Sequence, residues 1–184
     1  LRTSIQMVFQ DPAASLNERM KIKDIITEPL KINHMKPEAD SLREEAQNLL
    51  EDVGLNRSLA DRYPAELSGG MRQRVAIARA LSTRPRLIIA DEPVSSLDAP
   101  VRTQIIELFR KLRKERGFSL LFIAHDLSLI RNFCDRTGVM FRGKMVEMAE
   151  TENLFSDPRH PYTISLLSAI PTPDPVKERA KRIR

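Results

Sequence analysis

The sequence has a single cysteine and no long apolar run, and both absences limit what the protein can be. Cys134 is the only cysteine in 184 residues, which rules out an internal disulfide and fits a reducing cytosol. No apolar run approaches the roughly 20 residues that a membrane-spanning helix needs. The chain starts at Leu1 with neither a methionine nor the build of a signal peptide. We therefore expect it to be a piece of a longer protein.

The composition is that of a folded domain that is not built to bind nucleic acid. Apolar residues make up 41% of the chain and charged residues 30%, a balance that disfavours disorder. The length suffices for one domain with a hydrophobic core. Much of the net charge of +5 comes from residues 177–184, which we interpret as a solvated tail. Since the basic residues form no patch interleaved with aromatic side chains, we expect no nucleic-acid partner.

Apolar patterns predict strands and helices in alternation. Short β-prone or unbroken apolar runs predict three strands, at residues 4–9, 87–90 and 118–124, and the last two read as strands buried on both faces. Helical spacing predicts helices over residues 24–30, 41–53 and 68–81, and another that has Pro100 in its first turn and stops at Gly117.

Local signals add detail to these elements. Ser41 and Glu44 form a capping-box pattern, and Gly54 is placed to end the same helix in a left-handed conformation. Arg142 and Gly143 separate two apolar segments, which predicts a hairpin near a sheet edge.

The order of elements predicts an α/β domain with a parallel core and an inserted helical subdomain. Ligands of such sheets bind at the carboxyl ends of the strands. The chemistry should therefore lie directly after Phe9, Ala90 and Ala124, and a distinctive polar residue follows each of them.

Asp91 and Glu92 follow the buried strand at residues 87–90. Two adjacent carboxylates at the end of an apolar strand are costly unless a cation or a reaction uses their charge. Asp91 would then hold Mg²⁺ at a nucleotide's phosphates, and Glu92 would act as general base on the attacking water. The alternative is that both carboxylates cap the helix that follows.

Three further positions offer weaker signals. Ser68, Gly69 and Gly70 open a helix, where bare N–H groups and a hydroxyl can bind phosphate, although an ordinary glycine-rich helix start has the same pattern. His125 follows a strand and could bond a γ-phosphate oxygen, although a lone histidine is more often structural. Gln10 could ligate Mg²⁺ or hold a water, and a single glutamine carries little information.

The order and spacing of these residues resemble those of the nucleotide-binding subunit of ABC transporters along nearly the whole chain. Gln10 matches the family's Q-loop, and residues 67–74 match its LSGGxRQR signature. Residues 87–93 match the Walker B strand with its catalytic glutamate, residues 96–98 the D-loop, and His125 the switch histidine. We call Ser68 to Gly70 the signature turn.

The resemblance implies a P-loop NTPase-like (RecA-like) core whose N-terminal part is missing. The ATPase core would comprise residues 1–11 and 81–150, and the helical signature subdomain about residues 12–80. It also implies ATP and Mg²⁺ as ligands, with catalytic roles for Glu92 and His125.

The implied Mg²⁺ ligands are Asp91 and Gln10. Nucleotide binding would fall to Gln10, to the signature turn (Ser68, Gly69 and Gly70) and to Asp98 of the D-loop. The D-loop has Ser96 where the family more often has alanine, a change that we expect to be tolerated.

Finer similarity points to importers of dipeptides and oligopeptides. Residues 9–17 look like the Q-loop of those importers, and Met71 within the signature is common there. So is the tail from His160 to Thr163, which belongs to an extension at residues 151–184. Nickel and glutathione importers share most of these features. The sequence of the tail by itself predicts a proline-bounded helix with an apolar face.

The implied partners are a second ATPase subunit, head to tail, and transmembrane permease subunits, with an extracytoplasmic solute-binding protein acting indirectly. The implied location is the cytoplasmic face of the cell membrane. Two other interpretations stay open, a soluble ABC ATPase of DNA repair or translation and a truncated, non-catalytic interaction module.

One family motif is absent, because no Gly-x-x-x-x-Gly-Lys-[Ser/Thr] occurs in the chain. That loop forms most of the cradle for the β- and γ-phosphates. We therefore expect the chain alone to bind Mg-ATP weakly and not to hydrolyse it. We also expect an uncovered sheet edge or apolar face that favours self-association.

Overall fold

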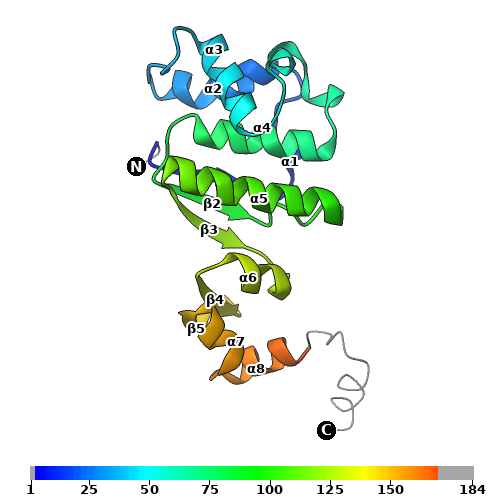
Figure 1. Ribbon diagram of the computed structural model, residues 1–184, viewed down its shortest axis with the longest axis vertical. Helices are drawn as coiled ribbons and strands as arrows, with labels where there is room; N and C mark the ends of the chain where they lie inside the picture. Colours follow the sequence, from blue (N-terminus) through cyan, green and yellow to red (C-terminus); the bar gives the residue numbers. More distant parts are fainter. Residues whose placement is uncertain (1–2, 170–184) are drawn as a thin grey trace. The chain divides into compact units, whose positions relative to one another are not determined.

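A three-stranded parallel sheet organises the first of the two units into which the chain divides, Leu1–Ala124 and His125–Arg184 (Figure 1). The computed structural model describes residues 3–169. The three predicted strands are confirmed, and they lie in the order β1 (Ile5–Val8), β2 (Leu87–Asp91) and β3 (Ser119–Ile123). All pairs are parallel, so the three carboxyl ends meet at one edge of the sheet.

Only one face of this sheet is buried, which corrects the prediction of strands buried on both faces. Val8, Ile88 and Ala90 share the buried face and are fully inaccessible. On the other face Leu121 is 51% exposed and Ile123 is 44% exposed. An unbroken apolar run shows that a strand can be covered on both sides, whereas the packed helices of this unit cover one side. The prediction of an uncovered apolar face is therefore confirmed for the described residues.

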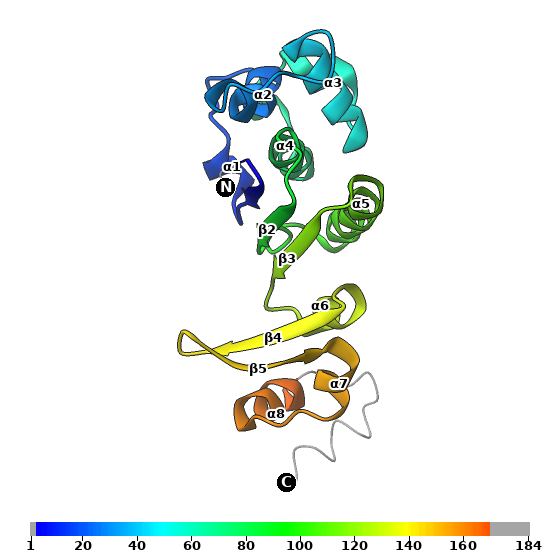
Figure 2. The ribbon, with the colours of Figure 1, turned by 90° about the vertical axis from the view of Figure 1, so that its left-hand side faces the viewer.

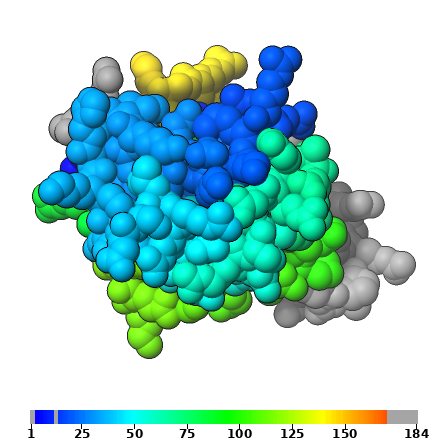
Figure 3. Space-filling view, turned by 90° about the horizontal axis from the view of Figure 1, so that it is seen from above, coloured from blue at the N-terminus to red at the C-terminus, as the bar shows by residue number. Residues whose placement is uncertain are grey.

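Helices cover the buried face and continue into a helical layer beyond it. The helices of the unit are α1 (Pro12–Ser15), α2 (Ile22–Ile32), α3 (Leu42–Asp52), α4 (Gly69–Leu81) and α5 (Ala99–Arg116), with 3₁₀ turns η1 (Arg57–Asp61) and η2 (Pro64–Glu66). Helices α4 and α5 run side by side next to the sheet, and Figure 2 looks nearly along both. Helices α2, α3 and α4 pack against one another, and Figure 3 shows α2 and α3, in blue and cyan, from above.

The helix ends follow the sequence signals closely. Ser41 accepts the N–H of Glu44 at 3.2 Å, which confirms Ser41 as the cap of α3. Gly54 and Gly117 adopt left-handed conformations with φ of +72° and +71°, Gly54 two residues after the end of α3 and Gly117 directly after α5. The predicted helix at residues 24–30 is longer than expected, because α2 begins at Ile22 and ends at Ile32.

Polar contacts tie the helical layer to α5. The Arg74 guanidinium on α4 donates to the Val53 carbonyl at 2.6 Å and to Gln104 Oε1 on α5 at 3.3 Å. Arg116 of α5 pairs with Asp52 of α3. The orientation of the helical layer is thus set by charged and polar groups as well as by apolar packing.

The second unit contains a hairpin that forms a sheet of its own. Its strands are β4 (Arg136–Phe141) and β5 (Lys144–Glu150), which confirms the predicted hairpin around Gly143. The hairpin carries an irregularity between Val139 and Met140. The other elements are α6 (Leu127–Phe133), α7 (Thr151–Ser156) and α8 (Pro161–Ser168).

Helix α8 confirms the predicted helix of the tail, and Glu147 holds its start. The Glu147 carboxylate accepts the backbone N–H groups of Arg159 at 2.8 Å and His160 at 3.0 Å. The Thr163 hydroxyl and these N–H groups hold the pKa of Glu147 below its usual value. Tyr162 stacks on Phe141 with ring centroids 4.3 Å apart. Ile170, Pro171 and the basic tail lie outside the described residues.

Candidate functional site

The ends of β1 and β2 bring two of the predicted site residues into contact. Gln10 lies two positions after β1, and Glu92 directly follows β2. The two strands are paired neighbours, so both residues reach the same edge of the sheet. The Gln10 Nε2 donates to Glu92 Oε2 at 3.0 Å. This hydrogen bond orients one oxygen of the carboxylate, and the structure therefore joins the amide and the proposed base directly.

Glu92 adopts a strained backbone conformation, with φ of +43°. A non-glycine residue in the left-handed region costs roughly 1–3 kcal/mol. Backbone contacts keep it there, because its N–H donates to the Ile123 carbonyl at 2.9 Å and its carbonyl accepts the Ser95 N–H at 3.2 Å. The Ser95 hydroxyl donates to the same carbonyl at 3.0 Å. The strain turns the chain sharply at the end of β2.

Ser95 is a site residue that sequence reasoning missed. It touches the Glu92 backbone rather than its side chain, and a serine in a turn is too common to stand out. The only available signal was its place in a short loop between a buried strand and a helix.

The strain at Glu92 makes a specific prediction about stability. Glu92→Ala and Glu92→Gly both remove the bond from Gln10, but only glycine adopts a φ of +43° without steric cost. We expect the glycine variant to exceed the alanine variant by about 1 kcal/mol in free energy of unfolding. Urea denaturation of both variants measures this difference. An alanine variant as stable as the glycine variant would show that the conformation is not strained.

The signature turn forms the first turn of α4. Ser68 is the cap of this helix, and its Oγ accepts the Met71 N–H at 3.3 Å. Gly69 is exposed and Gly70 is half-buried. A helix start with exposed glycine N–H groups is a favourable place for a phosphate, since the helix dipole adds positive potential. The structure thus agrees with a binding role and equally with an ordinary helix cap.

Asp98 caps the neighbouring helix. Its Oδ1 accepts the Val101 N–H at 3.0 Å, and its carbonyl accepts the Arg102 N–H at 2.8 Å. The side chain therefore has a clear structural task at the start of α5. The predicted contact of Asp98 with nucleotide stays a prediction.

Arg79 connects α4 to the segment that follows Gln10. Its guanidinium donates to the Ser15 carbonyl at 2.7 Å, at the end of α1. Burial lowers the pKa of Arg79, and the negative charge of Glu28 partly offsets this lowering. The helix that begins with the signature turn thus also holds the Gln10 segment.

Asp91 ends β2 beside Glu92 and is half-buried. The described residues contain no cluster of three or more His, Cys, Asp or Glu side chains that could hold a metal ion by itself. The donors at this edge nevertheless suit Mg²⁺, which is commonly bound by one or two carboxylates together with substrate phosphates. Gln10 uses its amide nitrogen toward Glu92, which leaves an oxygen of the right chemistry. The role of Asp91 and Gln10 as magnesium ligands stays a prediction.

His125 is the first residue of the second unit. It follows β3 by two positions, as the sequence indicates. Its expected bonds to a γ-phosphate and to Glu92 stay predictions.

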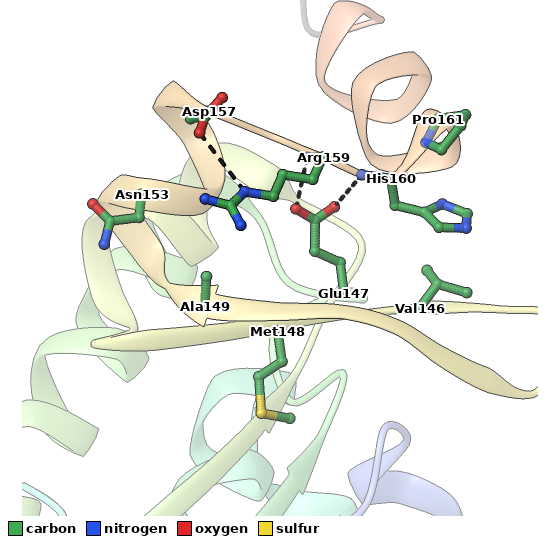
Figure 4. A pocket seen from close by; sticks show the side chains of 9 residues that line it. All are labelled: Val146, Glu147, Met148, Ala149, Asn153, Asp157, Arg159, His160 and Pro161. Carbon is green, nitrogen blue, oxygen red and sulfur yellow. Dashed lines mark hydrogen bonds and ion pairs between the residues drawn. The ribbon is translucent and has the colours of Figure 1, made fainter.

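A separate pocket lies within the second unit and contains none of the predicted site residues. Its volume is about 790 Å³, and it is lined by Val146, Glu147, Met148, Ala149, Asn153, Asp157, Arg159, His160 and Pro161. Figure 4 shows Glu147 pointing toward the segment of Arg159 and His160, whereas Met148 points to the other side of β5. The Glu147 carboxylate is used to hold that segment, so the pocket is a structural junction of the hairpin and α8.

Comparison with known families assigns this arrangement to a class. The model of the ABC transporter family matches residues 1–95, more than half of the chain. The chain therefore belongs to the ABC transporter family of ATP-binding proteins. A second model, described as the C-terminal region of oligopeptide/dipeptide transporters, matches residues 146–184.

Individual relatives narrow the assignment. The chain is 53% identical over 180 residues to the oligopeptide transport ATP-binding protein OppF of Bacillus subtilis, covering 98% of this chain and 59% of the relative. It is 52% identical to AmiF of Streptococcus pneumoniae, with 98% and 58% covered. By sequence the chain falls in the oligopeptide-type subfamily that these proteins represent. It spans somewhat more than half of their length.

Solved structures agree with the fold. CbiO1 of Clostridium perfringens, part of the transporter complex CbiONQ, superposes with a TM-score of 0.73 at 31% identity, over 85% of this chain and 61% of that one. The ATP-binding cassette MJ0796, a dimer bound to ADP and Pi, gives a TM-score of 0.68 at 31% identity, over 82% and 64%. None of the helices that the structure describes is long and apolar enough to cross a membrane.

Proposed function

We propose that the chain forms most of the ATP-hydrolysing subunit of an importer of dipeptides or oligopeptides. The observation that carries this proposal is the hydrogen bond between Gln10 and Glu92 at the carboxyl edge of the parallel sheet. In this proposal the Gln10 amide would sense the nucleotide, and the Glu92 carboxylate to which it is bonded would act on water. The oligopeptide transport role named for the relatives supports the choice of substrate.

The proposed reaction is attack of water on the γ-phosphate of ATP, which forms a bond from the water oxygen to the γ-phosphorus, breaks the bond to the β,γ-bridging oxygen, and releases ADP and inorganic phosphate. Glu92 orients the water and accepts its proton in the transition state. Asp91 and Gln10 would hold a magnesium ion, which neutralises charge developing on the phosphate oxygens. His125 would steady the γ-phosphate with a hydrogen bond. The turn bonds at Glu92 would hold its backbone, and the bond from Gln10 would orient its carboxylate, before the substrate arrives. Preorganisation of this kind lowers a barrier.

The signature turn would act on the ATP held by a second subunit. In the proposed head-to-tail pair, Ser68, Gly69 and Gly70 would face the phosphates of that nucleotide, with Asp98 nearby. The dimeric state of MJ0796 supports a pair of this kind. Permease subunits would bind the helical layer at the cytoplasmic face of the membrane, and an extracytoplasmic binding protein would deliver the peptide. ATP-driven closure of the pair would then drive transport.

The test is reconstitution of the full-length protein in proteoliposomes with its permease and binding-protein partners. We expect ATP hydrolysis that rises when the binding protein carries a peptide, together with peptide accumulation. A rate of ATP hydrolysis that does not change when the binding protein carries a peptide would instead indicate a soluble ABC ATPase. The absence of hydrolysis would indicate an interaction module. The 184-residue chain alone should show no measurable turnover, because it has no phosphate-binding loop in its sequence.

A further inference from the structure

We propose that Val101 is a positioning residue that locks the signature turn to the start of α5, and that position 70 is glycine because Val101 occupies the space of its Cβ. The consequence for ATP hydrolysis rests on the proposed function, whereas the packing claim does not. Nothing in the family motif itself names Val101, which lies three residues after Asp98.

The space around the two glycines is very different. A Cβ added to Gly70 would lie 2.7 Å from Val101 Cγ1, which is well inside van der Waals contact. A Cβ added to Gly69 would meet only Leu97 Cδ2 at 3.9 Å, an ordinary contact. Gly70 also lies in α4 and is not among the described glycines with positive φ. Its backbone conformation therefore suits any residue, and the reason for glycine is lack of room.

Val101 cannot easily move away from Gly70. A valine in a helix strongly prefers one χ1 rotamer, so its methyl groups have little freedom to turn. Its N–H is held by the Asp98 carboxylate at 3.0 Å. Pro100 stiffens the backbone directly before it, since the ring fixes φ. The methyl group that faces Gly70 is thus held by the cap of α5.

Val101 therefore links the signature turn rigidly to the turn at Asp98, where α5 begins. Each is the first turn of a helix, and Val101 fills the gap between α4 and α5 at that end. A shift of one helix start would have to move the other, because packed side chains do not deform continuously. In the proposed dimer both turns face the second subunit, so Val101 would keep the two contact points in register.

Two explanations of Gly70 give opposite results in one experiment. If Val101 requires the glycine, then Val101→Ala creates room and rescues Gly70→Ala. If the close approach of a phosphate requires it, then Val101→Ala rescues nothing.

The first measurement is urea denaturation of the 184-residue chain with Gly70→Ala, Val101→Ala, the double variant and Gly69→Ala as matched control. We expect Gly70→Ala to lower the folding equilibrium constant at least tenfold and Gly69→Ala to change it less than threefold. The double variant should be at least fivefold more stable than the product of the single effects. Additive effects would overturn the proposal.

If the Gly70→Ala variant does not fold, the test is whether the double variant, which also carries Val101→Ala, folds. A folded double variant supports the steric link, and an unfolded one overturns it, since Val101 would not be the obstacle.

The second measurement is ATP hydrolysis by the full-length protein carrying the same substitutions. We expect Gly70→Ala and Val101→Ala each to lower turnover, Gly70→Ala at least tenfold, because each disturbs the contact between the two turns. The double variant should recover most of that loss, since the methyl group added at position 70 fills the space that Val101 gives up. Recovered stability without recovered turnover would overturn the positioning role. A wild-type protein without hydrolysis would contradict the proposed function, while the denaturation result would still judge the packing claim separately.

Discussion

Replacing Phe109 by alanine is expected to lower the free energy of unfolding of the first unit by about 3–5 kcal/mol. Phe109 is fully buried on α5 and meets Phe122 of β3 edge to face, with ring centroids 6.3 Å apart. The variant loses the transfer free energy of the ring, leaves a cavity, and forfeits the aromatic contact. Because domains are stable by only about 5–15 kcal/mol, this loss removes a large fraction of the free energy of unfolding.

Phe9→Ala is the matched control for this prediction. Phe9 is 46% exposed in the same unit, so its removal should cost far less than the loss of Phe109. Thermal and urea denaturation, followed by circular dichroism, measure both variants. Equal losses of unfolding free energy for the two variants would mean that Phe109 does not hold α5 against the sheet.

The strand ends were predictable because they depend on periodicity and topology. An apolar run bounded by polar residues predicts a strand, and parallel neighbours bring their carboxyl ends to one edge. This is why the positions of Gln10 and Glu92 at a shared edge could be inferred before the structure was known. The capping role of Ser41 and the left-handed Gly54 follow from equally local rules.

Other features depend on atomic packing that no local pattern describes. The sequence wrongly predicts that β3 is buried on both faces, because its apolar residues do not indicate which elements of the fold cover them. The left-handed backbone of Glu92 arises from bonds to Ile123 and Ser95, which are distant or inconspicuous in the sequence. The fit of Val101 against Gly70 joins residues 31 positions apart in two helices. The predicted roles of Asp91 and His125 stay predictions.

Replacing Glu92 by glutamine in the full-length protein is expected to reduce ATP turnover by at least about 10²-fold while nucleotide binding persists. The amide has the shape of the carboxylate and can still accept the hydrogen bond that Gln10 donates at 3.0 Å. The fold and the strained turn should therefore be unchanged. What is lost is a negative charge that polarises water and accepts its proton, an interaction made mainly in the transition state.

Glu115→Gln provides the control, since Glu115 is an exposed residue near the end of α5 and should keep full turnover. Phosphate release gives the turnover number, and equilibrium binding of a fluorescent ATP analogue gives the affinity. Turnover that falls in step with affinity would show that Glu92 only binds nucleotide. Unchanged turnover would remove Glu92 from the chemistry and leave the Gln10–Glu92 bond as a structural contact. Loss of turnover with retained binding would make Glu92 the residue on which hydrolysis depends, because an isosteric change at one carboxylate leaves every other contact of the site in place.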